Sequence, residues 1–161
     1  MIFAVSIFTI DRNEGKMRRE AVILIAEDDP GHRILIKKSL ARSGIHNQIV
    51  EFTNGKDVLD FFFESDGSSK KLDTPYILIL DIKMPKMDGI EVLRRIKNDD
   101  SLKKIPVAVL STTDDPHEID DSYELGCCIY IVKPLESGKF VDTIKKLGDF
   151  LTVVTLPEMV C

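Results

Sequence analysis

The sequence has little cysteine, and this shortage limits what the protein can be. Only three cysteines, Cys127, Cys128 and Cys161, occur in 161 residues. Three cysteines, two of them adjacent in sequence, do not form a disulfide framework, and their spacing is not that of a metal site. We therefore interpret Cys127 and Cys128 as small core or interface residues in a reducing compartment, and we expect a cytoplasmic location.

Positive charge is also in short supply. The chain has 22 Lys and Arg against 27 Asp and Glu, which gives a net charge of -5. A general nucleic-acid surface needs Lys and Arg to neutralise phosphates, so we expect no nucleic-acid partner. A hydrophobic content of 43% is ordinary for a globular protein, and the length fits one domain with a buried core.

A long apolar run is missing as well. Residues Met1 to Ile10 are mostly apolar, but ten residues cannot cross a bilayer as a helix. No positively charged region precedes them, and no small-residue cleavage site is evident before the charged run that begins at Asp11. We expect a poorly ordered extension over residues 1–20, with Met1 or Met17 as the natural start, and no membrane partner.

From Ala21 onward, short apolar runs alternate with amphipathic stretches. Four of the five runs are almost continuously apolar, which is typical of strands covered on both faces. The second run is polar at alternate positions, as an edge strand would be. The predicted strands are Val22–Ile25, Gln48–Phe52, Tyr76–Leu80, Val107–Leu110 and Ile129–Val132.

Helical patterns fill the gaps between these strands. This alternation predicts a (βα)5 domain, in which helices cover both faces of a parallel sheet. In such folds the active site lies beyond the carboxyl ends of the strands. The apolar positions that mark the helices are Ile36 and Leu40; Val58, Leu59 and Phe62; Ile90, Leu93 and Ile96; the weaker stretch Ile119 to Leu125; and Phe140, Ile144, Leu147 and Leu151.

Charged and hydroxyl residues follow four of the predicted strands. Acidic residues 27–29 follow the first strand, Asp81 the third, Ser111 the fourth and Lys133 the fifth. Converging carboxylates repel one another unless a cation joins them, and an all-oxygen cluster suits Mg²⁺. With Lys133 and Ser111 added, the group could stabilise a phosphoryl group transferred to a carboxylate. Taken singly, each residue has a plainer explanation: Asp28 or Asp29, for example, could merely cap a helix.

Four motifs then resemble the response-regulator receiver family, the CheY-like fold, over about 21–150. They are Ile-Ala-Glu-Asp-Asp-Pro at 25–30, Leu-Asp-Ile-Lys-Met-Pro-Lys-Met-Asp-Gly at 80–89, Leu-Ser-Thr at 110–112 and Val-Lys-Pro at 132–134. The resemblance implies a flavodoxin-like (βα)5 doubly wound sandwich, an α/β fold with strand order 2-1-3-4-5. It also divides the chain into a receiver domain over 21–150 and a tail over 151–161.

The resemblance further implies a role for each site residue. Asp81 would be the phosphoacceptor, and Lys133 would pair with the phosphoryl group. Asp28 would bind Mg²⁺ directly, Glu27 would act chiefly through water, and the backbone carbonyl of Lys83 would complete the protein ligands. The Lys83 side chain could either approach the acidic pocket or stay solvated.

The switch residues are implied in the same way. Ser111 matches the hydroxyl that moves toward the phosphoryl group, and Tyr130 matches the aromatic side chain that changes rotamer with it. The family also implies a cis peptide bond between Lys133 and Pro134, which would aim the lysine into the site.

Within the family, the chain is similar to small regulators of the phytochrome-associated type. The similarity rests on Glu-Asp-Asp-Pro-Gly-His, the long loop 65–75 and the terminal Phe-Leu-Thr-Val-Val-Thr-Leu-Pro. It implies a sensor histidine kinase as a partner, and a downstream protein target or phosphotransfer protein as another. We expect no effector domain after the fifth helix. The β-prone tail 151–156 could pack on its own domain or help to form a homodimer.

Two rival functions need to be weighed. A haloacid-dehalogenase-type phosphohydrolase also uses an aspartyl nucleophile after a strand, but it needs a second Asp two residues later, where this chain has Lys83. A phosphorylation-independent binding module usually loses a residue of the acidic pair, the nucleophile or the lysine, and this chain keeps them all. We therefore predict a phosphoacceptor signalling protein and not an enzyme, although it would assist its own phosphorylation and dephosphorylation.

Overall fold

The computed structural model describes residues 20–154 and 156, and its elements alternate as the sequence predicts. Strand bounds differ from the predicted ones by at most one residue. The elements are β1 (Val22–Ala26), α1 (Pro30–Arg42), β2 (Ile49–Phe52), α2 (Gly55–Phe62), β3 (Tyr76–Asp81), α3 (Gly89–Lys97), β4 (Val107–Ser111), α4 (Pro116–Glu124), β5 (Ile129–Val132) and α5 (Ser137–Leu151).

The five strands form one parallel sheet in the order β2-β1-β3-β4-β5, which confirms the predicted topology. The half-polar strand β2 lies at one edge, as its alternation indicates. All strands run in the same direction, so their carboxyl ends meet at one edge of the sheet. In that register Asp81 pairs with Leu110, and Ser111 pairs with Val132.

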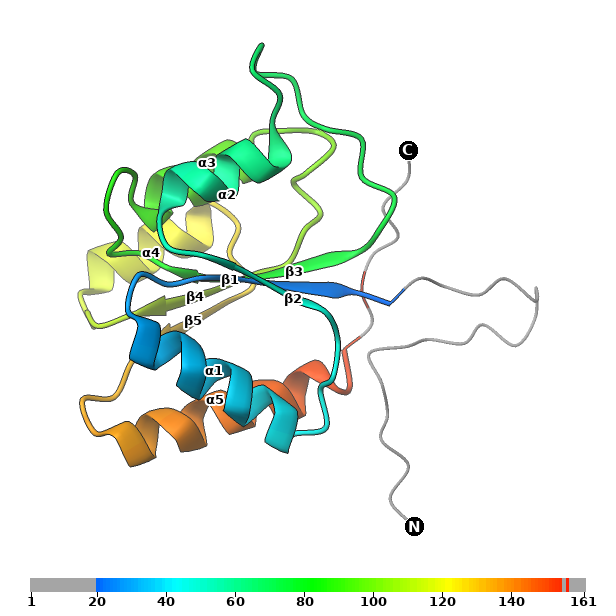
Figure 1. The fold of residues 1–161 in the computed structure, drawn as a ribbon. Coiled ribbons are helices and arrows are strands. Elements are labelled where there is room, and N and C mark those ends of the chain that lie inside the picture. The colour runs from blue at the N-terminus through cyan, green and yellow to red at the C-terminus, as the bar shows by residue number, and fades with distance from the viewer. Residues whose placement is uncertain (1–19, 155, 157–161) are drawn as a thin grey trace.

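Helices cover both faces of the sheet: α1 and α5 lie on one side, and α2, α3 and α4 lie on the other (Figure 1). Alternate residues of each central strand therefore enter different cores. In β3, Ile77 and Ile79 pack with the α1 and α5 side, whereas Leu78 and Leu80 pack with the α2 and α3 side. Burial of both strand faces explains why the runs are continuously apolar.

Short polar side chains start four of the five helices. The side chains of Asp29, Asn54, Asp88 and Asp115 each accept a hydrogen bond from a backbone N–H of the first turn. Such caps satisfy N–H groups that have no partner within the helix. Because Asp115 caps α4, this helix begins at Pro116, three residues earlier than its apolar pattern predicts.

The C-terminal segment begins at the end of α5. Leu151 is the last residue of this helix and is buried, as the apolar stripe of the fifth helix predicts, and no strand occurs in the described part of 151–156. Val154 and Leu156 are partly buried and pack against the core beneath α1 and α5. For these two residues, packing on the domain itself is therefore what the structure shows.

Several expectations concern residues outside the described range. The predicted extension over residues 1–20 lies there except for Glu20, and so does Cys161. Of the other cysteines, Cys127 is buried in the core, as predicted, and Cys128 is exposed. Within residues 20–154 and 156, the longest apolar stretches of helix are too short or too polar to cross a membrane.

Candidate functional site at the carboxyl edge of the sheet

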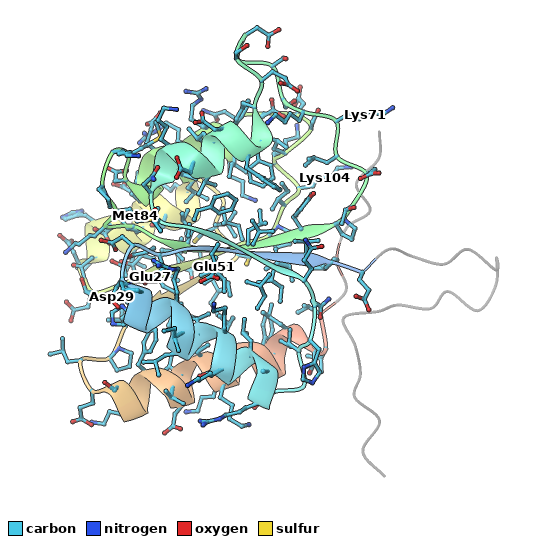
Figure 2. The ribbon with its side chains drawn as sticks, viewed as in Figure 1. Glu27, Asp29, Glu51, Lys71, Met84 and Lys104 are labelled. Carbon is cyan, nitrogen blue, oxygen red and sulfur yellow. The ribbon has the colours of Figure 1, made fainter. Side chains whose placement is uncertain are left out.

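The predicted site residues meet at the carboxyl ends of the strands. Glu27 follows β1 directly, Asp81 is the last residue of β3, Ser111 ends β4 and Lys133 follows β5. Figure 2 shows Glu27 and Asp29 at this edge, with Met84 of the loop after β3 nearby, whereas Lys71 and Lys104 lie at the other end of the molecule. Glu27, Asp81, Ser111 and Lys133 are all buried, which is unusual for such polar side chains.

Three carboxylates form a compact cluster within this site. Glu27, Asp28 and Asp81 each offer an oxygen atom, and these atoms lie within 4.8 Å of one another. Asp28 is the exposed member of the cluster. Its neighbour Asp29 instead caps α1, because its Oδ1 accepts a hydrogen bond of 2.8 Å from the N–H of His32. The sequence had left open which of the two aspartates serves as the cap.

Lys133 supplies the opposite charge. Its Nζ lies 2.5 Å from Oε2 of Glu27 and 3.2 Å from Oδ2 of Asp81. Both contacts are buried, so water screens them little. The ammonium thus bridges the two buried carboxylates. With Asp28, the site holds three carboxylates and one ammonium, so its net charge is negative.

The environment raises the pKa of Asp81 to about 6. Burial of the carboxylate is the main cause, and the nearby charge of Glu27 acts in the same direction. The ammonium of Lys133 and the N–H of Lys83, which donates to Oδ1 of Asp81 over 3.3 Å, oppose this rise. A further cation beside Asp81 would therefore stabilise its ionised form and lower its pKa.

The cluster has the donor chemistry of a hard divalent cation. Mg²⁺ prefers carboxylate and carbonyl oxygens and keeps several waters, so a carboxylate cluster with one exposed member fits it. Glu27, Asp28 and Asp81 are the side chains that would hold the ion. The Lys83 side chain is exposed. The role of its carbonyl as a ligand stays a prediction.

Two neighbours that the sequence did not reveal position the acidic pair. Nη1 of Arg33 donates to the carbonyl oxygens of Glu27 and Asp28, over 2.7 and 3.0 Å. The backbone N–H of Asp29 donates to Oε1 of Glu27 over 3.1 Å. Arg33 is partly buried in the first turn of α1, where its Nε also lies 3.4 Å from Oε1 of Glu51, and nothing in the sequence singles out an arginine at this position.

The loop after β3 is held against the site by a close backbone contact at Gly89. A Cβ atom at this position would lie 2.3 Å from the carbonyl oxygen of Asp81. The N–H of Gly89 also donates to the carbonyl of Ile82 over 2.7 Å. Only glycine lets the start of α3 approach the phosphoacceptor candidate so closely.

The predicted switch residues meet on a third side chain. Oγ of Ser111 donates to Oε1 of Glu118 over 2.8 Å, and the hydroxyl of Tyr130 donates to the same oxygen over 2.6 Å. Glu118 lies in the first turn of α4. An acidic residue is common there because of the helix dipole, so nothing in the sequence distinguishes Glu118 from other first-turn residues.

One expectation about the site is wrong. The peptide bond between Lys133 and Pro134 is trans, and no cis bond occurs in the described part of the chain. The trans form is ordinarily preferred even before proline. The Lys133 ammonium reaches both carboxylates in this conformation, so its placement in the site does not depend on the predicted isomer.

The fold and the site together define a doubly wound α/β domain with a cluster of three carboxylates and a lysine at the carboxyl edge of its sheet. Residues 23–145 match the family described as the response regulator receiver domain. The chain belongs to the response regulator receiver family of two-component signalling. It is thus a signalling domain, which removes the phosphohydrolase alternative.

Three solved relatives place the chain within this family. A receiver domain from Rhodospirillum rubrum is 37% identical, with a TM-score of 0.83, over 87% of this chain and 99% of the other. Response regulator Rcp1 of Synechocystis sp. is 32% identical over 137 residues, which are 84% of this chain and 92% of Rcp1. The Mn²⁺-bound structure of Rcp1 has a TM-score of 0.74. Phosphorylated RcpA, a cyanobacterial phytochrome response regulator, is 33% identical with a TM-score of 0.74, over 85% of this chain and 98% of RcpA.

Proposed function

We propose that Asp81 accepts a phosphoryl group from a phosphohistidine of a sensor histidine kinase. The observation that carries the proposal is the buried Asp81 carboxylate, which lies beside Lys133 and shares a cluster with Glu27 and Asp28. An Asp81 oxygen forms the new bond to phosphorus, while the bond from phosphorus to the histidine nitrogen breaks and that nitrogen keeps the electron pair. The products are an acyl phosphate on Asp81 and a free imidazole.

Lys133 and the acidic pair have separate tasks in this proposal. The Lys133 ammonium is close enough to Asp81 to stabilise the negative charge that a phosphoryl group brings. Mg²⁺, held by Glu27, Asp28 and Asp81 with the carbonyl of Lys83, would supply further neutralisation of phosphoryl oxygens. The Mn²⁺-bound form of Rcp1 supports a divalent cation in a related protein.

The direct test compares Asp81→Asn with Asp88→Asn in labelling by acetyl phosphate and Mg²⁺. Asp88 caps α3 seven residues further along, and Asn serves as well as Asp in a cap. We expect no acyl phosphate on the Asp81 variant and normal labelling of the Asp88 variant, measured by intact mass and acid or base lability. Mg²⁺-dependent labelling that persists in Asp81→Asn would contradict the assignment.

The output would pass through protein contacts of α4, β5 and α5. Tyr123 of α4, Val132 of β5 and Leu135 before α5 are exposed apolar residues on these elements, with Leu135 98% exposed. A downstream protein or a phosphotransfer protein in the cytoplasm would bind there, and a homodimer is the other form that such contacts could take. Sedimentation with and without beryllofluoride separates the two: a rise in mass indicates the dimer.

The kinase that we propose is a phytochrome-type photosensor. Its support is the similarity to RcpA, a phytochrome response regulator, and to Rcp1. Phosphotransfer from a panel of purified histidine kinases tests this part separately. Transfer to Asp81 that is fastest from a phytochrome kinase supports it, and faster transfer from kinases without a photosensor overturns it while leaving the role of Asp81 intact.

A further inference from the structure

Glu118 is an acidic side chain outside the cation cluster that contacts both switch residues. One oxygen, Oε1, accepts from Ser111 Oγ over 2.8 Å and from the Tyr130 hydroxyl over 2.6 Å. Within the same helix, Ser122 Oγ donates to the Glu118 carbonyl one turn earlier over 2.7 Å. The carboxylate is half-buried, so these bonds are partly shielded from water.

Ser111 cannot donate a hydrogen bond to Glu118 and to a phosphoryl group at the same time. A serine hydroxyl carries a single proton, and here Ser111 directs it to Glu118. The same proton cannot be donated to a phosphoryl oxygen on Asp81 at the same time. Any role of Ser111 toward the phosphoryl group therefore begins with the loss of its bond to Glu118.

The contact with Tyr130 is of a different kind. Its hydroxyl lies 2.6 Å from Glu118 and 3.1 Å from the carbonyl oxygen of Thr113, so the carboxylate is the nearer of two acceptors. Burial and the hydrogen bond to Glu118 both raise the pKa of Tyr130, which keeps the phenol protonated as a donor. A rotamer change of Tyr130, which the family resemblance implies for a switch residue, would break this bond as well, but only the Ser111 contact competes for a proton with a phosphoryl group on Asp81.

We propose that Glu118 is a positioning residue that opposes phosphorylation of Asp81 by holding the Ser111 hydroxyl away from it. The inference rests on the proposed function of Asp81 and deepens it. Only a contact that differs between two states can shift the balance between them, and the bond from Ser111 to Glu118 is such a contact. Removal of the carboxylate should therefore favour the phosphorylated form.

The test measures the initial rate of Mg²⁺-dependent labelling by acetyl phosphate in the full chain. Glu118→Gln keeps the size of the side chain but removes the charge, and Glu118→Ala removes the acceptor altogether. We expect both variants to be labelled about three to ten times faster than the wild type, the factor that corresponds to the net contribution of one typical hydrogen bond. Asp120→Asn removes one exposed charge from the same helix and should change the rate less than about twofold.

A double-mutant cycle distinguishes positioning from a general effect on α4. Ser111→Ala removes the proton through which Glu118 would act, so adding Glu118→Gln to that variant should change the labelling rate less than about 1.5-fold. An equal acceleration with and without Ser111 would overturn the proposal, and so would Glu118 variants that are labelled no faster than the wild type. Affinity for Mg²⁺ and beryllofluoride, followed by ¹⁹F NMR, should rise in parallel with the rate.

Failure of this inference can be told from failure of the proposed function. If the wild type itself takes up no phosphoryl group on Asp81, the proposed function is wrong. If the wild type is labelled normally and the Glu118 variants are not faster, only the role of Glu118 is wrong.

Discussion

Nζ of Lys133 donates a hydrogen bond of 2.5 Å to Oε2 of Glu27, although 106 residues separate the two in the sequence. Both side chains are almost completely buried. A buried ion pair of this kind is costly to break, because removal of one partner leaves a charge without compensation. The pair therefore stabilises the site only while it is complete.

Lys133→Met should lower the free energy of unfolding by about 3 kcal/mol at pH 8, because Glu27 and Asp81 would then face each other unpaired. Urea unfolding in a chelating buffer measures the change. Lys139→Met is the matched control, since Lys139 pairs with Glu136 on the exposed surface of α5. We expect a change of less than about 0.5 kcal/mol there. Equal effects of the two substitutions would contradict the importance of burial.

Asp81 should make stability depend on pH when no divalent cation is present. Its pKa is about 6 in the folded chain, above the value near 3.8 of the unfolded chain. The folded state therefore holds more protons between these values, so stability falls as the pH rises from about 4 to about 6.

Asp81→Asn removes this titration. The variant should be more stable than the wild type by about 3 kcal/mol at pH 8 and nearly equally stable at pH 3, below both pKa values. Unfolding curves across this range check the sign. A stability difference that does not change with pH would show that the pKa of Asp81 is not raised.

Asp28 should matter for the cation, and Asp29 should not. Asp28→Asn removes a charged ligand of the cluster, and we expect the affinity for Mg²⁺ to fall at least about tenfold. Asp29→Asn keeps a side chain that caps α1, so its affinity should change less than about threefold. Calorimetric titration measures both affinities. A larger loss of Mg²⁺ affinity in Asp29→Asn than in Asp28→Asn would show that Asp29, and not Asp28, is the ligand.

Gly89→Ala should destabilise the loop that carries the site. The added Cβ would lie 2.3 Å from the Asp81 carbonyl, so α3 would have to move away. We expect a loss of about 2 kcal/mol in the free energy of unfolding. Gly138→Ala in α5 meets no atom within 4 Å and should instead stabilise by about 0.5–1 kcal/mol. If both substitutions destabilised equally, the close contact with the Asp81 carbonyl would not be the reason for Gly89.

The hydrophobic pattern alone predicted the order of strands and helices along the chain and the edge of the sheet at which the charged and hydroxyl residues lie. Continuous apolar runs such as residues 76–80 require burial on both faces, and the parallel sheet that follows brings its carboxyl ends together. Asp81 and Lys133 could therefore be placed at one edge from their positions after strands. The resemblance to receiver domains then gave them roles that spacing alone does not give.

Which side chains contact one another could be seen only in the packed domain. Asp29 and not Asp28 is the cap, Lys133 bridges Glu27 and Asp81, and Glu118 receives the hydroxyl of Ser111. Local patterns encode burial and helix ends, because these depend on neighbours in sequence. Contacts between distant side chains depend on strand register, helix placement and rotamers, which are fixed only when the whole domain packs.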